Sequence, residues 1–211
     1  NFITASLKTK KSATVQRQLK SIAAMFNFVS LQLDIKADKQ HCFEKFFIPG
    51  LGDDLETRAD FTDDQIRLIR NMPPSNTLEI DCMIHLMLDT GLRVKECCGL
   101  LVKDVDLKAE TPHLVLYKNN IRGLKNKNSR RIVPLVGASL TALLKLTEAE
   151  LSTFLFPRYV IETENEVKNG SASAACNKRL EALLGQSCPT SHCFRHTMQT
   201  RLRNAECPKD K

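Results

Sequence analysis

The stretch TLEIDCMIHLMLDTGLRVKECCGLL, residues 77–101, decides the fold of this chain. Its first half is predicted to form a helix, Gly91 permits a tight turn, and a short second helix is expected over 93–100. Arg93 opens this second helix, at the end where the helix dipole gives a cation no benefit. Glu96 follows on the same face and can hold the guanidinium in place. The segment is therefore either a surface ion pair or one side of a site for an anion.

Two later segments are rich in cations. Residues 124–135, LKNKNSRRIVPL, are predicted to form the basic tip of a β-hairpin, where a lysine can donate to a phosphate or a leaving oxygen. A solvated charge run is the alternative. In SHCFRHT, residues 191–197, His192 and Arg195 lie three apart and share a helical face. Such a pair suits a phosphodiester, because arginine neutralises the non-bridging oxygens while histidine moves a proton, but it can also be structural.

The whole pattern predicts a mainly helical fold with a small antiparallel β-sheet, the α+β class. Helices are expected at 12–33, 62–70, 77–89, 93–100, 138–146, 172–184 and 191–204, and strands at 114–117 and 131–133. Pro49, Gly50 and Gly52 interrupt every periodicity and indicate a linker. The predicted organisation is a partial helical domain at 1–50, a linker at 51–60 and a larger domain at 61–211.

Charge is divided unevenly along the chain, whose net charge is +7. Residues 1–50 hold eight Lys/Arg against three Asp/Glu, residues 51–81 hold three against eight, and residues 118–131 hold six basic residues and no acid. Two basic segments on either side of an acidic one predict two surfaces that bind phosphate groups.

The cysteines and the apolar runs indicate where the protein resides and whether it binds a metal. The eight cysteines contain no CxxC pair, so they are interpreted as reduced core residues of an intracellular protein without a metal site. No run is long and apolar enough to cross a membrane, and the sequence shows no secretion signal.

Taken in order, the patterns TGLRxxE, LKxKxSRRxVPL and HxxRHTxxTRL resemble the catalytic domain of the tyrosine recombinases, the phage integrase family. The resemblance covers residues 60–211, and residues 1–50 resemble the C-terminal part of that family's helical core-binding domain, which binds DNA. It implies that the full-length protein acts on double-stranded DNA as a homo-oligomer, a tetramer, with no cofactor, metal or membrane. The protein would then be cytoplasmic and would come from a bacterium or a phage-derived mobile element.

The family's functional residues can be carried over position by position. By resemblance, the catalytic residues are Arg93, Lys125, His192 and Arg195, with Glu96 and His196 in support. The two arginines would clamp the scissile phosphate, the lysine would protonate the leaving 5′ oxygen, and the histidine would contact the phosphate and transfer a proton. The predicted DNA-binding residues are Lys8, Lys10, Lys11, Arg17, Lys20, Arg122, Lys127, Arg130 and Arg131.

The family's nucleophile, a tyrosine beyond the HxxR helix, has no counterpart among these 211 residues. Only Tyr117, in a predicted strand, and Tyr159, in a predicted loop, are present, so the chain is expected to stop before the nucleophile. The whole protein is predicted to integrate or recombine DNA at specific sites through a 3′-phosphotyrosine intermediate, whereas this chain alone would not cleave. A catalytically inactive DNA-binding relative and a type IB topoisomerase-like enzyme are the alternatives.

Overall fold

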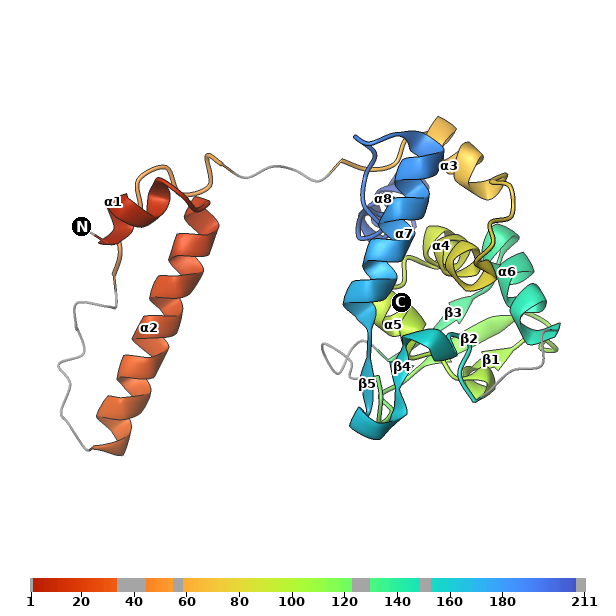
Figure 1. Cartoon of the computed structure of the whole chain (residues 1–211), viewed down its shortest axis with the longest axis horizontal. Helices are drawn as coiled ribbons and strands as arrows, with labels where there is room; N and C mark the ends of the chain where they lie inside the picture. The colour runs from red at the N-terminus through yellow and green to blue at the C-terminus, as the bar shows by residue number, and fades with distance from the viewer. Residues whose placement is uncertain (1, 34–44, 55–58, 123–129, 149–152, 208–211) are drawn as a thin grey trace. The chain divides into compact units, whose positions relative to one another are not determined.

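The computed structural model describes residues 2–33, 45–54, 59–122, 130–148 and 153–207. The chain forms two compact units, Asn1–Thr57 and Arg58–Lys211, which are described separately (Figure 1).

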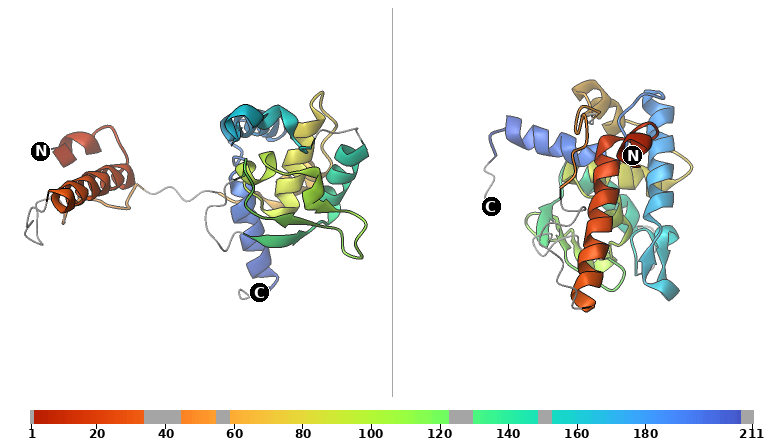
Figure 2. Two further views of the ribbon diagram at one scale, coloured as in Figure 1. Left: turned by 90° about the horizontal axis from the view of Figure 1, so that it is seen from below. Right: turned by 90° about the vertical axis from the view of Figure 1, so that its left-hand side faces the viewer.

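The first unit is built on one long helix. Helix α1 (Phe2–Leu7) precedes α2 (Ser12–Gln32), which Figure 2 shows as a straight rod and which matches the helix predicted over 12–33. Val15 and Leu19 of α2 are buried against Ile48, which lies in the segment that returns along the helix. The backbone N–H and the hydroxyl of Ser12 both donate to the Asp54 carboxylate at 2.5 Å. These bonds tie the end of the returning segment to the start of α2.

The second unit contains the remaining helices and two small sheets. In chain order its elements are α3 (Asp63–Arg70), α4 (Leu78–Thr90), α5 (Val94–Cys98), η1 (Val102–Asp104), β1 (Val105–Asp106), β2 (His113–Leu116), β3 (Arg131–Pro134), α6 (Gly137–Glu148), η3 (Pro157–Tyr159), β4 (Val160–Ile161), η4 (Glu162–Glu164), β5 (Glu166–Val167), α7 (Asn169–Leu184) and α8 (Cys193–Asn204). Antiparallel pairing gives one sheet in the order β1-β2-β3 and a second of β4 and β5.

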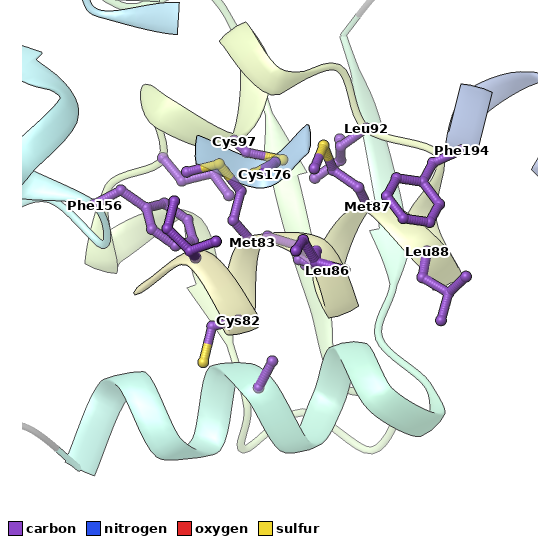
Figure 3. Packing of buried hydrophobic residues seen from close by; sticks show 14 of the residues in the cluster. Cys82, Met83, Leu86, Met87, Leu88, Leu92, Cys97, Phe156, Cys176 and Phe194 are labelled. Carbon is purple, nitrogen blue, oxygen red and sulfur yellow. The ribbon is translucent and has the colours of Figure 1, made fainter. Parts of the chain in front are cut away.

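Helix α4 is the centre of the second unit. It contacts α3, α5, α6, α7 and α8, and Figure 1 shows α6 and α7 flanking it on opposite sides. Met83, Ile84, Leu86 and Met87 are fully buried, as expected for a helix at the centre of a core. Figure 3 shows α4 side chains packed with Phe156 and other core residues from distant parts of the chain. The turn that follows α4 is therefore anchored at the middle of the core.

The predicted fold class is confirmed, and the helix and strands that the sequence did not predict are short. Strands β1, β4 and β5 have two residues each, too few to display a period, and helix α1 has six, less than two turns. The helix predicted over 93–100 ends at Cys98, where the chain turns at Gly99. The strand predicted over 114–117 ends at Leu116, so Tyr117 lies just outside the ladder.

Arg122 corrects one prediction, because it is not available to DNA. Its side chain is 0% exposed and its Nη1 donates to the Asp104 carboxylate at 3.0 Å, where both side chains are fully buried. The same guanidinium donates to the carbonyls of Gly99 and Tyr117. Arg122 is therefore a structural residue that joins β2 to the segment after α5, since a buried arginine needs a full set of acceptors.

Gly99 is expected to tolerate no side chain, because an added Cβ would lie 2.7 Å from Cβ of Arg122. Gly99→Ala should lower the free energy of unfolding by about 1–3 kcal/mol, as overpacking does. The chain has no tryptophan, so urea unfolding is best followed by circular dichroism at 222 nm.

Gly170, on α7, is the matched control, because a Cβ there would meet nothing within 4 Å. Gly170→Ala should leave stability unchanged or raise it by up to about 1 kcal/mol, since alanine favours helix. Equal effects of the two substitutions would contradict the close approach of Arg122 to Gly99.

Candidate functional site

Gly91 sets the position of the turn after α4. It caps that helix with φ 62° and ψ 23°, a left-handed conformation that glycine adopts at little cost. A Cβ on Gly91 would lie 3.2 Å from Cβ of Met198, on α8. The residue is thus required twice, for its backbone conformation and for the close packing of the turn against α8.

Glu96 gathers two arginines beyond this turn. The carboxylate is only 4% exposed, and its Oε1 accepts a hydrogen bond from Nη1 of Arg93 at 2.8 Å. Its Oε2 accepts from Nη2 of Arg131, on β3, and from the backbone N–H of Arg93, both at 3.0 Å. One carboxylate therefore binds two guanidiniums, one on each oxygen, and joins α5 to β3.

The electrostatics of Glu96 favour its ionised form. Burial acts to raise the pKa of this carboxyl, but hydrogen bonds from Arg131 and the Arg93 backbone, with the charges of both arginines, outweigh burial. The pKa is therefore held below its ordinary value. The Arg93 and Arg131 side chains remain 31% and 28% exposed, so both keep part of their surface open to solvent.

Arg195 brings a third guanidinium to the same place from α8. Its Nη1 donates to the Gly91 carbonyl at 3.1 Å, across the packed turn. Burial lowers the pKa of Arg195, and the positive charges of Arg93 and Arg131 lower it further, while Glu96 opposes them. Two guanidiniums thus bind one carboxylate and a third lies within its electrostatic reach, so these four side chains together carry more positive than negative charge.

Helix α8 presents the histidines beside Arg195. Phe194 and Thr197 are buried, and Phe194 stacks on Phe61 with ring centroids 4.5 Å apart. The backbone N–H of Phe61 donates to the Thr197 hydroxyl at 3.0 Å. With that face turned inward, His192 at the N-cap and His196 one turn later are exposed, their ring centroids 5.7 Å apart.

The structure thus brings together Arg93, Glu96 and Arg195 of the predicted site, with His192 three residues before Arg195 on the same helix. Lys125 and Lys127 lie outside the described residues. Of the predicted DNA contacts, Lys8, Lys10, Lys11, Arg17, Lys20 and Arg130 are exposed.

The ion pair between Arg131 and Glu96 was not predicted, because in the sequence Arg131 is one cation of a basic run. Alternation along the strand could have revealed it, since Arg131 lies on the same face as the buried Val133.

Both tyrosines make structural contacts. Tyr159 is 4% exposed, and burial raises the pKa of its hydroxyl. The Tyr117 carbonyl accepts from Arg122, whose guanidinium lies 5.5 Å from the Tyr117 ring centroid. In the described part of the chain, no three His, Cys, Asp or Glu side chains form a group that could hold a metal ion, and no helix is long and apolar enough to cross a membrane.

Comparisons with known proteins show which family and which fold the chain matches. The model of the phage integrase family matches residues 60–211. A tyrosine recombinase XerC of Roseiflexus castenholzii is 24% identical over 215 residues, covering 92% of this chain. The chain spans 60% of the length of that relative.

Two solved structures resemble the chain in fold. The Tn1549 transposon integrase in complex with transposon right-end DNA aligns with 96% of this chain and 70% of its own, at 20% identity and a TM-score of 0.67. A lambda integrase tetramer bound to a Holliday junction aligns with 98% of this chain and 59% of its own, at 16% identity and a TM-score of 0.64.

Removing the Glu96 charge should destabilise the second unit in a pH-dependent way. Glu96→Gln is expected to lower the free energy of unfolding at pH 7 by roughly 3 kcal/mol, the cost of breaking a buried ion pair. Because the folded pKa lies below the ordinary value of 4.5, the ionised carboxylate stabilises the fold above that pH. The stabilisation is lost as the pH falls through the folded pKa, so wild type and variant should converge below pH 4.5.

Urea unfolding curves between pH 7 and pH 3 measure this difference. Glu181→Gln, an exposed carboxylate on α7, is the control and should have little effect. A Glu96→Gln deficit that stays constant over this range would contradict the role of the ionised carboxylate.

Proposed function

Because the chain belongs to the phage integrase family, we propose that it is the catalytic part of a protein that cuts and rejoins double-stranded DNA at specific sites. The observation that carries this function is the cluster of Arg93, Arg131 and Arg195 around the single buried carboxylate of Glu96. A cluster with excess positive charge and partly open guanidiniums is suited to bind a phosphodiester.

Arg93 and Arg195 are the proposed clamp on the scissile phosphate. A guanidinium presents paired N–H donors in a plane, which match two oxygens of a phosphate group better than a single ammonium does. Glu96 and the Gly91 carbonyl orient the two side chains before DNA binds. Oriented donors stabilise the charge that develops in the transition state without a further cost of reorganisation.

His192 and Lys125 are the proposed proton-transfer groups. The exposed imidazole of His192 stands at the start of the helix that carries Arg195, where it can reach the same phosphate. The role of Lys125, protonation of the leaving 5′ oxygen, rests on the sequence pattern alone. His196, next to Arg195, is proposed to support the imidazole of His192 through the contact of their rings.

The proposed chemistry is phosphoryl transfer through a protein-linked intermediate. A tyrosine hydroxyl attacks phosphorus, a 3′-phosphotyrosine forms, and the leaving strand takes a proton to become a free 5′-hydroxyl. Attack by a 5′-hydroxyl on this ester restores the DNA and the tyrosine, so the bond energy is conserved and no cofactor is needed. The burial of Tyr159 and the packing of Tyr117 favour a nucleophile outside these 211 residues.

The first unit, 1–57, is proposed to be the end of a helical core-binding domain that meets the DNA backbone. Its exposed cations Lys8, Lys10, Lys11, Arg17 and Lys20 support this role. The proposed assembly is a homotetramer on DNA in the full-length protein, in line with the lambda integrase tetramer. The proposed place of action is the cytoplasm, where the target DNA lies.

Replacing Arg93 should separate cleavage from binding in the full-length protein. Arg93→Ala should lower the rate of covalent adduct formation by about 10²–10³-fold, since it removes a donor to the transition state. DNA affinity should change by less than about threefold, because one phosphate contact among many is lost.

Denaturing gels measure the adduct and mobility shifts measure the affinity, with Arg67→Ala as the control. Arg67 is an exposed arginine on α3, in a surface pair with Asp64. Wild-type protein that binds its site yet forms no adduct would instead support the inactive DNA-binding relative.

Charge reversal on α2 should affect affinity without sequence preference. Arg17→Glu should weaken binding to specific and non-specific DNA by a similar factor and reduce the slope of log K against log salt by about one unit. The control is Lys168→Glu, an equal charge change at an exposed residue before α7. Binding titrations at four or more salt concentrations measure both slopes, and an unchanged slope for Arg17→Glu would remove this residue from the DNA surface.

A further inference from the structure

We propose that Arg131 is a third arginine of the phosphate site, held by Glu96 so that its guanidinium shares the charge of the transition state with Arg93 and Arg195. This inference rests on the proposed DNA-cleaving function and extends it to a residue of β3. It replaces the prediction from the sequence that Arg131 is one of several DNA-binding cations in a basic hairpin.

The geometry of the Glu96 carboxylate is the first observation. Arg93 binds Oε1 at 2.8 Å and Arg131 binds Oε2 at 3.0 Å, so the two guanidiniums lie on opposite oxygens of one group. They come from α5 and β3, which are far apart in sequence. The same carboxylate that orients the first arginine of the clamp therefore orients Arg131 as well.

The stoichiometry of charge is the second observation. In the buried pair of Arg122 and Asp104, one arginine neutralises one carboxylate, and both side chains are 0% exposed. Glu96 instead binds two arginines, whose side chains keep 31% and 28% exposure. Both guanidiniums are therefore oriented by a buried carboxylate while part of their surface stays open to an anion.

The coupling to Arg195 is the third observation. Arg195 donates to the Gly91 carbonyl at 3.1 Å. Burial, then the charges of Arg93 and Arg131, lower the pKa of Arg195 while Glu96 opposes them, so Arg195 lies within electrostatic reach of both other guanidiniums and is repelled by them. A phosphodiester with one negative charge relieves this repulsion. The five-coordinate transition state carries a second negative charge, which matches three guanidiniums that are offset by one carboxylate.

The test compares two substrates that differ by one charge at the scissile phosphorus. A methylphosphonate replaces one non-bridging oxygen with a methyl group, so both ground state and transition state carry one negative charge less. Tyrosine attack and departure of the 5′ oxygen remain possible. A residue that acts on this charge should matter less for the methylphosphonate, whereas a residue that only holds the fold should matter equally for both.

Arg131→Gln and Arg67→Gln are the matched variants in the full-length protein, because Arg67 is an exposed arginine on α3 whose charge is the same. Arg131→Gln should slow cleavage of the phosphodiester by roughly 10–100-fold but that of the methylphosphonate by less than about threefold. Arg67→Gln should have little effect on either rate. Equal slowing of both substrates by Arg131→Gln, or no slowing of either, would overturn the proposal.

Binding of inorganic phosphate to the 211-residue chain separates this inference from the proposed function. If wild type forms no adduct with DNA, the cleavage function fails, but the anion site can still be judged. Phosphate at constant ionic strength should raise the melting temperature of wild type and Arg67→Gln, because it binds the folded state. The shift should shrink in Arg131→Gln, and an undiminished shift in that variant would remove Arg131 from the site.

Discussion

The candidate site depends on one buried carboxylate. Glu96 is 4% exposed and accepts hydrogen bonds from two guanidiniums and one backbone N–H. Without that acceptor, Arg93 and Arg131 would repel each other and each would search many rotamers in solvent. The carboxylate thus converts two flexible cations into fixed donors, at the cost of cancelling one of their charges.

The central helix determines where this carboxylate stands. Most residues of helix α4 are buried, so the turn at its end is fixed relative to the core, and Gly91 lets α8 pack directly against that turn. The Gly91 carbonyl then accepts from Arg195. The packing of α4 and a left-handed glycine therefore set the distance between the two arginines of the proposed clamp.

Much of the fold and part of the candidate site could be predicted from the sequence. The contacts that could not be predicted are those between residues far apart in the chain. Local sequence spacing of three or four residues predicts the long helices and the pairing of Arg93 with Glu96. The Gly91 turn is predicted from the glycine between two helical segments. The partners of Arg122 and Arg131 lie 18 and 35 residues away, and no local period reports which cation meets which carboxylate. Arg122 and Arg131 both belong to one basic run in the sequence, yet Arg122 is buried and Arg131 is partly exposed.

That contrast explains how one basic segment serves two purposes. Arg122 at its start meets Asp104 alone, in a neutral and fully buried pair that fixes the end of β2 to the chain after α5. Arg131 at its end shares the Glu96 carboxylate with Arg93 and keeps 28% of its side chain exposed. Full burial of a charge is tolerated only when partners compensate it, whereas a half-buried guanidinium can still contact solvent or a ligand. Exposure, rather than the number of cations, therefore distinguishes Arg122, which holds the fold, from Arg131, which is proposed to contact a phosphate.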